Sequence, residues 1–221
     1  MKNKSEKENA LVFSYLTLRK TIGLLGLALP VVLAVGGLLI FDPPGLQRSI
    51  SAYFYTNISQ VFVGTLWAIG FFLLSYKGYG RADAIAGDLG CIFAVGMTLF
   101  PTRPEIVVSS KDVLFGQIHL AFAALFFLTL IFFSVFLFTK TDPSKTPTRE
   151  KLQRNRVYKA CGYIMAICIL LIAVYFRLPE ADASFLKSCH PVFWLETIAV
   201  VAFGISWLTK GEAILKDQGG S

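Results

Sequence analysis

The stretch from residue 48 to residue 64 concentrates uncharged hydrogen-bonding side chains at the start of an apolar segment. It contains serine, threonine and tyrosine hydroxyls, an asparagine amide and one arginine. Such groups can bind a small polar molecule or a lipid headgroup, and a serine beside a base can act as a nucleophile. Ser49, Ser51, Tyr53 and Tyr55 alternate along the chain, while Ser51 and Tyr55 are also one helical turn apart. The spacing therefore leaves the local conformation open.

Three ionisable residues, Asp88, His119 and Glu196, lie inside long apolar runs. A charged or titratable group within hydrocarbon is costly and marks a candidate functional site. Whether these residues can act together depends on the elements that carry them and on the depth of each residue in its element.

The composition is that of a membrane protein. Of the 221 residues, 55% are hydrophobic and 16% are charged, whereas a soluble domain carries about 25% charged residues. Six apolar runs are long enough for a helix to cross a bilayer, which takes roughly 17 to 25 residues. Because backbone polar groups must be paired within hydrocarbon, these runs are expected to be helical. We predict an all-α integral membrane protein, a bundle of six transmembrane helices at about 21–41, 59–76, 84–100, 114–138, 157–176 and 191–208.

The segments outside these helices define the rest of the organisation. Residues 1–20 are predicted to form a cytoplasmic tail and an interfacial amphipathic helix, because apolar residues recur there at helical spacing. Residues 21–211 form the transmembrane domain, which includes a basic cytoplasmic loop at 140–156, and residues 212–221 form a cytoplasmic tail.

The basic residues indicate which way the bundle faces. With six crossings, 16 of the 21 lysines and arginines fall on the side that contains both termini, and 5 fall on the other side. The positive-inside rule then predicts that both termini are cytoplasmic. The net charge of +7 is thereby explained by topology. We expect no nucleic-acid partner, and membrane lipids are the expected partners of the basic side.

Depth decides which ionisable residues can meet. His119 and Glu196 each lie about five residues from the outer end of their runs, roughly 7 to 8 Å deep, whereas Asp88 lies roughly 6 Å from the inner end. In a core of about 30 Å, Asp88 is then about 16 Å from the other two along the membrane normal. We therefore predict an outward-facing ligand-binding pocket that does not include Asp88. Its residues are Ser49, Ser51, Tyr53, Tyr55, Arg103, His119 and Glu196.

Several functions are compatible with such a pocket. Binding of a lipid-like or small polar ligand is favoured, and the alternatives are a proton-coupled transporter, with Asp88 as a second station, and a metal-dependent lipid hydrolase. A purely structural alternative carries similar weight: the tyrosines and Trp194 form an aromatic belt, and Glu196 hydrogen-bonds a neighbouring helix. For Asp88 we favour a structural role, such as pairing with Arg81. Whether the chain is an enzyme stays open.

Common catalytic and cofactor motifs are absent from the sequence. There is no phosphate-binding glycine loop, G-x-S-x-G, H-E-x-x-H or C-x-x-C. No cofactor is predicted, and zinc would enter only with the hydrolase alternative. The four cysteines indicate no disulfide framework, because Cys91, Cys161 and Cys168 lie in apolar runs and leave Cys189 alone outside. A second copy of the chain is a further candidate partner.

Three details of the runs predict packing. Small residues in the third run allow close helix approach, and the Trp67 indole within the second requires a hydrogen-bond partner. The phenylalanines at 126, 127, 132, 133, 136 and 138 of the fourth run are expected mostly to face lipid.

Several motifs resemble a family of small multi-pass bacterial membrane proteins of uncharacterised function. They are Ser49-Ile50-Ser51-Ala52-Tyr53-Phe54-Tyr55-Thr56, Leu99-Phe100-Pro101-Thr102, Phe193-Trp194-Leu195-Glu196 and the run from Phe203 to Gly211. The resemblance covers nearly the whole chain. It implies an integral protein of a bacterial inner membrane and carries no established activity.

A looser resemblance connects the chain to membrane hydrolases of the alkaline ceramidase and adiponectin receptor type. Those proteins combine a serine, an aspartate and three histidines at a zinc ion within seven helices. This chain departs from that pattern, with six predicted spans, one histidine inside a span and no H-x-x-x-H motif.

Overall fold

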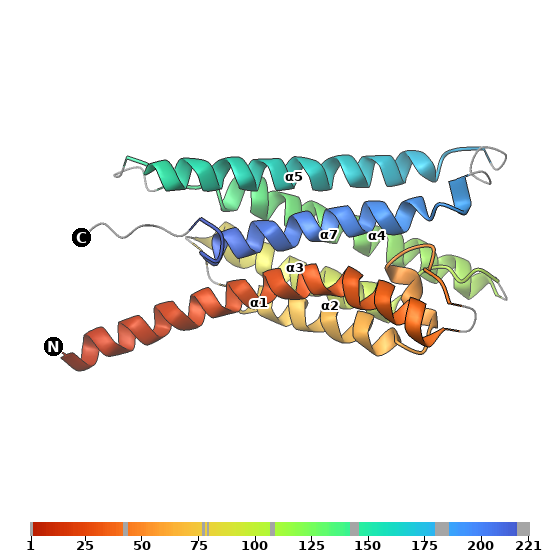
Figure 1. Cartoon of the computed structure of the whole chain (residues 1–221), viewed down its shortest axis with the longest axis horizontal. Coiled ribbons are helices and arrows are strands. Elements are labelled where there is room, and N and C mark those ends of the chain that lie inside the picture. The colour runs from red at the N-terminus through yellow and green to blue at the C-terminus, as the bar shows by residue number, and fades with distance from the viewer. Residues whose placement is uncertain are drawn as a thin grey trace.

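The protein is a bundle of long α-helices that run roughly along one common axis (Figure 1). The structure is a computed structural model. It describes residues 2–41, 44–76, 78, 80–106, 109–141, 146–179 and 186–215, with side chains described from Ser14 onward. Within these residues there are six α-helices and no strands. The prediction of an all-α protein is confirmed.

The helix bounds follow the predicted apolar runs closely. The helices are α1 (Lys2–Ile40), α2 (Ser59–Leu74), α3 (Arg81–Leu99), α4 (Ser110–Phe132), α5 (Arg149–Tyr175) and α7 (Pro191–Lys210). A short 3₁₀-helix, η1 (Ser51–Tyr55), precedes α2, and a π-helical turn, η2 (Phe133–Leu137), extends α4. Five of the helices are long and apolar enough to cross a membrane, and α2, with 16 residues, is the shorter one.

Two predicted boundaries differ from the structure. The helix expected to lie separately within residues 1–20 is continuous with the first span, because α1 runs from Lys2 to Ile40. The loop expected at 140–156 is shorter, since α5 already begins at Arg149. There the Thr148 hydroxyl accepts a hydrogen bond from the Lys151 amide and caps the helix. Residues 142–145 of that loop and 216–221 of the predicted C-terminal tail lie outside the described residues.

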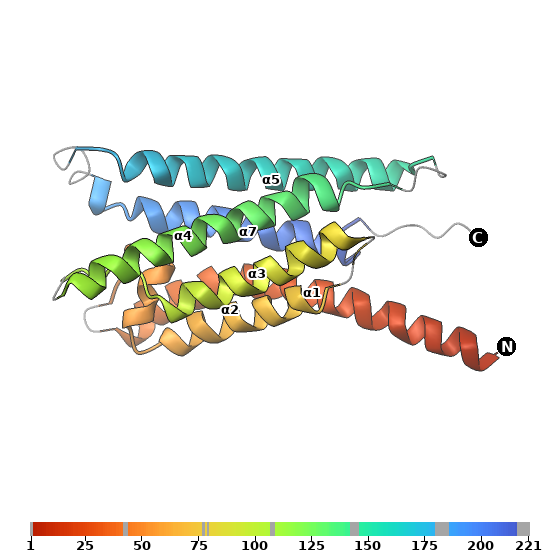
Figure 2. The same ribbon diagram turned by 180° about the vertical axis from the view of Figure 1, so that it is seen from behind.

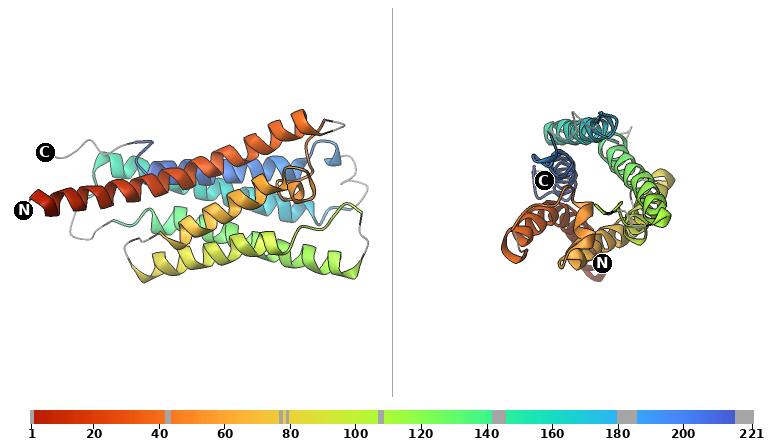
Figure 3. Two further views of the ribbon diagram at one scale, coloured as in Figure 1. Left: turned by 90° about the horizontal axis from the view of Figure 1, so that it is seen from below. Right: turned by 90° about the vertical axis from the view of Figure 1, so that its right-hand side faces the viewer.

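The start of α1 and the end of α7 lie at one end of the bundle, here called the terminal end. η1 lies at the opposite end, here called the far end (Figures 1 and 2). The helices pack in a ring-like order: α1 contacts α2 and α7, α3 contacts α2 and α4, and α5 contacts α4 and α7. The view along the axis in Figure 3 follows this order around the bundle.

Small residues bring neighbouring helices into close contact. As predicted for the third run, a Cβ atom on Gly87 of α3 would lie too close to the Leu73 carbonyl oxygen of α2. The same closeness, which was not predicted, occurs between α1 and α7. Gly23 of α1 and Gly204 of α7 face each other, and a Cβ atom on either would lie 2.8 Å from the carbonyl oxygen of the other. The Trp67 indole of α2 donates a hydrogen bond of 2.7 Å to the Thr98 hydroxyl of α3. The partner expected for this indole is therefore present, on the adjacent helix.

The prediction that the phenylalanines of the fourth apolar run mostly face lipid is wrong. Phe126, Phe127, Phe133 and Phe138 are buried, whereas Phe132 and Phe136 are exposed. The π-helical turn η2 begins at Phe133 and ends just before Phe138, and it adds one residue to the helical turn between these two buried rings. The buried rings pack with others, for example Phe133 and Phe138 around Trp207 of α7 at centroid distances of 5.5 and 5.0 Å.

Candidate functional site

The polar stretch after α1 folds into η1, which resolves the conformation that its spacing left open. Amides 52 and 53 donate to the carbonyl oxygens three residues earlier, at 3.2 Å each. The Ser49 hydroxyl accepts a second hydrogen bond from the Ala52 amide at 3.0 Å. Ser49, Ser51 and Tyr53 are buried, and Tyr55 is exposed. At three residues per turn, Ser51 and Tyr55 lie one and a third turns apart and point to different sides of η1, in agreement with the burial of one and the exposure of the other.

Tyr53 anchors η1 in the bundle. Its ring lies 6.0 Å from that of Phe41 and 6.2 Å from that of Phe193, and the side chain has no exposed surface. Its hydroxyl oxygen accepts a hydrogen bond from the Gln47 amide. Burial raises the pKa of the Tyr53 phenol, so this group stays neutral and acts as a hydrogen-bonding anchor.

Glu196 on α7 holds the backbone at the start of η1. Its Oε2 atom accepts a hydrogen bond of 2.6 Å from the Ile50 amide. In the opposite direction, the Phe193 amide in the first turn of α7 donates to the Arg48 carbonyl oxygen at 3.1 Å. Hydrogen bonds to a carboxylate are among the stronger ones in proteins. The segment before α2 is thus tied to α7 by two hydrogen bonds that run in opposite directions.

The same segment is also tied to the loop between α3 and α4. The Arg48 guanidinium donates to the Arg103 carbonyl oxygen, and the Tyr55 hydroxyl donates to the Thr102 carbonyl oxygen at 2.7 Å. Arg103 contributes its backbone to this contact, while the residue itself is exposed. Arg48, which was not among the predicted site residues, is therefore the arginine whose side chain makes the contact.

His119 on α4 caps the end of α3. Its Nδ1 atom lies 2.9 Å from both the Met97 and the Phe100 carbonyl oxygens, and the side chain is buried. Carbonyls in the last turn of a helix lack intrahelical partners, so an imidazole N–H can satisfy them. The described hydrogen bonds of His119 lead to α3 and those of Glu196 lead to the η1 segment, so no hydrogen bond links the two predicted site residues.

Two polar atoms close to Glu196 in the sequence have no hydrogen-bond partner among the described residues. They are Nδ1 of His190, which precedes α7, and Oγ1 of Thr197, and both atoms are buried. His190 has a φ of 48° and lies just before the helix, and Thr197 lies about two turns further along the chain. Buried polar atoms are usually paired, so each exception requires an explanation. Neither residue was among the predicted site residues, and Thr197 gave no signal in the sequence beyond its position beside Glu196.

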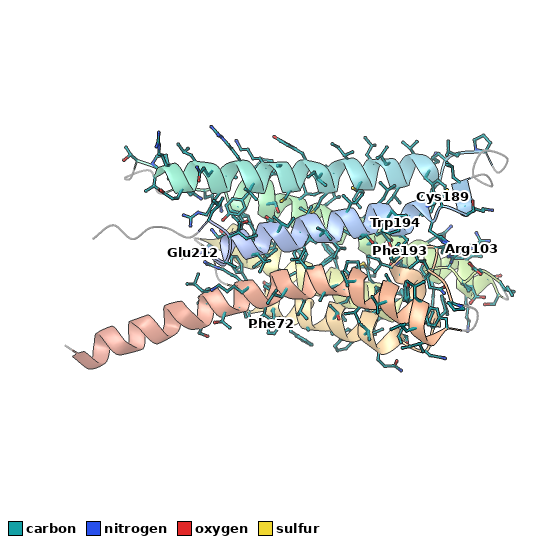
Figure 4. The ribbon with its side chains drawn as sticks, in the orientation of Figure 1. Phe72, Arg103, Cys189, Phe193, Trp194 and Glu212 are labelled. Atoms are coloured by element: carbon teal, nitrogen blue, oxygen red, sulfur yellow. The ribbon has the colours of Figure 1, made fainter. Side chains whose placement is uncertain are left out.

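These residues lie toward the far end of the molecule, and Figure 4 shows Arg103, Phe193 and Trp194 there, with Glu212 near the terminal end.

Asp88 of α3 is exposed, as is Arg81, and neither takes part in an ion pair between described residues. The fully buried carboxylate of α3 is Asp83, which pairs with Lys140 at 3.0 Å.

No group of three or more histidine, cysteine, aspartate or glutamate side chains suited to hold a metal ion occurs within the described part of the chain. Comparison of the chain with protein families, with curated proteins and with solved structures found no match.

Proposed function

We propose that the chain is an integral protein of a bacterial inner membrane, with six transmembrane helices and both termini in the cytoplasm. Five helices have the length and apolarity of spans, and the sixth, α2, is apolar over 16 residues, or about 24 Å. The start of α1 and the end of α7 at one end of the bundle fit an even number of crossings (Figure 1). The distribution of 16 and 5 basic residues supports a cytoplasmic terminal end and an external far end.

The native cysteines allow a direct test of this topology. Cys91, Cys161 and Cys168 are buried, whereas Cys189 is exposed in the segment that leads into α7. A membrane-impermeant maleimide applied to spheroplasts should label Cys189. A Thr146→Cys variant in a Cys189→Ser background should be labelled only after permeabilisation. Labelling of Thr146→Cys from outside intact spheroplasts contradicts the proposed topology.

We further propose that the far end binds a lipid-like or small polar ligand beside Glu196. Two buried polar atoms without a hydrogen-bond partner among the described residues carry this proposal. They are Nδ1 of His190, just before α7, and Oγ1 of Thr197 on α7, and they flank Glu196 in the sequence. A ligand with both donor and acceptor groups would satisfy these atoms, which otherwise remain desolvated at a cost. The hydroxyls of Ser49, Tyr53 and Tyr55 then serve mainly to shape the segment before α2 and to hold it against the loop between α3 and α4, and Ser51 is buried within η1.

The remaining predicted residues have supporting roles in this proposal. His119 keeps the end of α3, and with it the Thr102–Arg103 backbone, at the position that Arg48 and Tyr55 contact. The exposed Arg103 side chain can attract an anionic headgroup from the outer surface.

Thr197→Val provides a test whose sign differs between ligand-free and ligand-bound protein. Removing an unpaired buried hydroxyl should leave the ligand-free protein equally stable or up to about 1–3 kcal/mol more stable. The same variant should reduce the amount of lipid that co-purifies with the protein, as measured by native mass spectrometry. Thr129→Val is the matched control, because the Thr129 hydroxyl already bonds the Leu125 carbonyl oxygen at 2.8 Å.

The outcomes separate the ligand proposal from a structural role. Reduced lipid retention in Thr197→Val but not in Thr129→Val supports binding at α7. A loss of stability in Thr197→Val with unchanged lipid retention means that this hydroxyl is paired within the protein, and it contradicts the proposal.

A further inference from the structure

The terminal end contains a second cluster that the proposed ligand site does not use. Its centre is aromatic and joins four elements: Tyr76 after α2, Phe138 after η2, Tyr158 on α5 and Trp207 on α7. The ring of Phe138 lies 5.0 Å from that of Trp207 and 5.3 Å from that of Tyr158. The ring of Tyr76 lies 5.2 Å from that of Trp207. All four side chains are at most 2% exposed.

Basic side chains surround this aromatic centre. The Arg19 guanidinium carbon of α1 lies 5.5 Å from the Tyr76 ring centroid. The Lys151 ammonium lies 5.8 Å from the Tyr158 ring, and the Lys210 ammonium lies 5.3 Å from the Phe138 ring. A cation over an aromatic face is stabilised electrostatically, but its net charge remains. These contacts therefore bring basic groups of α1, α5 and α7 together around the aromatic centre.

The cluster contains more basic than acidic groups among the described residues. The Lys210 ammonium interacts electrostatically with Arg19, Lys151, Arg154 and Asp83. The acidic members are Asp83, in its ion pair with Lys140 at 3.0 Å, and Glu212, whose Oε1 atom lies 3.9 Å from Arg154 Nη1. Like charges brought together in a poorly solvated region repel one another, so an excess of positive charge favours an added anion. The basic members are Arg19, Lys140, Lys151, Arg154 and Lys210.

Two buried donors in this cluster have no acceptor among the described residues. They are the Nε atom of Arg19 and the Nε1 atom of Trp207. Both can only donate, so their missing partner is an acceptor. Because neither atom is exposed, that acceptor must reach between the helices rather than rest on the outer surface.

We propose that the cluster at the terminal end binds a phosphate group between α1, α5 and α7. A phosphate supplies several acceptor oxygens and a negative charge, which match the unpartnered donors and the excess of basic side chains. A guanidinium can bind it through two parallel hydrogen bonds. The phosphate can come from the headgroup of an anionic phospholipid, since basic sites between transmembrane helices bind such headgroups, or from free phosphate in solution. This site is separate from the proposed ligand site at the far end.

The test uses the full chain in nanodiscs, with ¹⁵N-labelled tryptophan as the probe. The protein contains three tryptophans, and a Trp207→Phe variant assigns the indole resonance of Trp207. In discs of phosphatidylcholine alone, titration with inorganic phosphate tests the free anion. In a second series, part of the phosphatidylcholine is replaced by phosphatidylglycerol, which tests the headgroup. We expect the Trp207 resonance to shift in at least one of the two series, and the series that produces the shift identifies the source of the phosphate.

Charge-neutralising variants show whether the basic cluster itself binds. Arg19→Gln should lower the affinity measured through the Trp207 resonance about fivefold. This loss corresponds to about 1 kcal/mol for one basic contact. Arg156→Gln is the matched control, because it removes the same charge from an exposed position on α5, two residues from Arg154. If Arg19→Gln does not fold, Arg19→Lys keeps the charge but loses the Nε donor, and it should still weaken binding measurably.

Specific outcomes would overturn the proposal. One is the absence of a Trp207 shift in both series. Another is an equal effect of Arg19→Gln and Arg156→Gln, which means general attraction to an anionic surface. A third is unchanged binding in Arg19→Lys, which excludes the guanidinium donor from the site. None of these results affects the proposal for the far end, because His190, Glu196 and Thr197 are not changed.

Discussion

Replacing Glu196 by glutamine or by leucine separates the charge of this residue from its hydrogen bond. In the wild type, Oε2 accepts the Ile50 amide at 2.6 Å. Hydrogen bonds to charged groups contribute about 1.5–3 kcal/mol and neutral ones about 0.5–1.5 kcal/mol. Glutamine keeps an acceptor of the same shape, so Glu196→Gln should cost about 1 kcal/mol of unfolding free energy.

Glu196→Leu should cost considerably more, because it removes the acceptor altogether. Ile50 is only 4% exposed, so its amide is left desolvated and unpaired. That adds a penalty of about 1–3 kcal/mol and brings the total to about 2–4 kcal/mol. For a chain of this length, 1 kcal/mol shifts the Tm by about 2–4 °C. We therefore expect a Tm reduction of about 2–4 °C for glutamine and of about 5–15 °C for leucine.

The assay is thermal unfolding in mild detergent, followed by tryptophan fluorescence, with size-exclusion chromatography to measure the folded fraction. Glu212→Gln is the control at the terminal end. Its contact with Arg154 spans 3.9 Å, and the Glu212 side chain is 31% exposed, so its loss should cost less than about 1 kcal/mol. Lipid retention is measured on the same samples, and both Glu196 variants should reduce it. Equal destabilisation by glutamine and leucine would refute the reasoning, because the charge would then be a structural requirement and the ligand proposal would lose its main residue.

The remaining predictions concern packing and buried polar groups, and each is checked by the same unfolding assay. Gly204→Ala should destabilise the protein by about 1–3 kcal/mol because its methyl group meets a backbone carbonyl of α1. The control is Gly64→Ala, which should be neutral or slightly stabilising because its methyl group meets nothing within 4 Å. Asp83→Asn should lower the free energy of unfolding by about 1–2 kcal/mol, less than for a fully buried ion pair because its partner Lys140 is 40% exposed. Asp88→Asn should have no comparable effect, because Asp88 is exposed. His119→Leu should cost about 1–3 kcal/mol by leaving the α3 carbonyls uncapped, and His119→Gln should recover part of that loss; equal effects of the two would mean that the imidazole packs but does not cap.

The helices could be predicted from the sequence because their signal is local. Apolar runs of about 20 residues identify each helix, and the structure moves most of the predicted ends by only a few residues. The need of the Trp67 indole for a partner was also predictable, since the indole N–H is a property of the residue itself. Which group would meet it was not, because Thr98 lies on another helix.

The direction in which each side chain points required the tertiary structure. Asp83 and Asp88 are five residues apart, which places them about 140° apart around α3. One therefore faces the bundle and the other faces away, but an apolar helix shows only a weak difference between its faces. The same limit explains the phenylalanines of the fourth apolar run, since four of the six are buried and two of these, Phe133 and Phe138, pack against aromatic rings of other helices.

The sequence by itself determined that this chain is an all-α protein with helices long and apolar enough for a membrane, because apolarity and helix length are properties of consecutive residues. It also identified Glu196, His119 and the η1 hydroxyls as the polar groups of interest. Only the tertiary structure decided their partners. The Ile50 amide is 146 residues from Glu196, and the carbonyls that His119 caps are 19 and 22 residues from it. Such contacts depend on how the helices pack, and packing is set by the shapes of all the neighbouring side chains together.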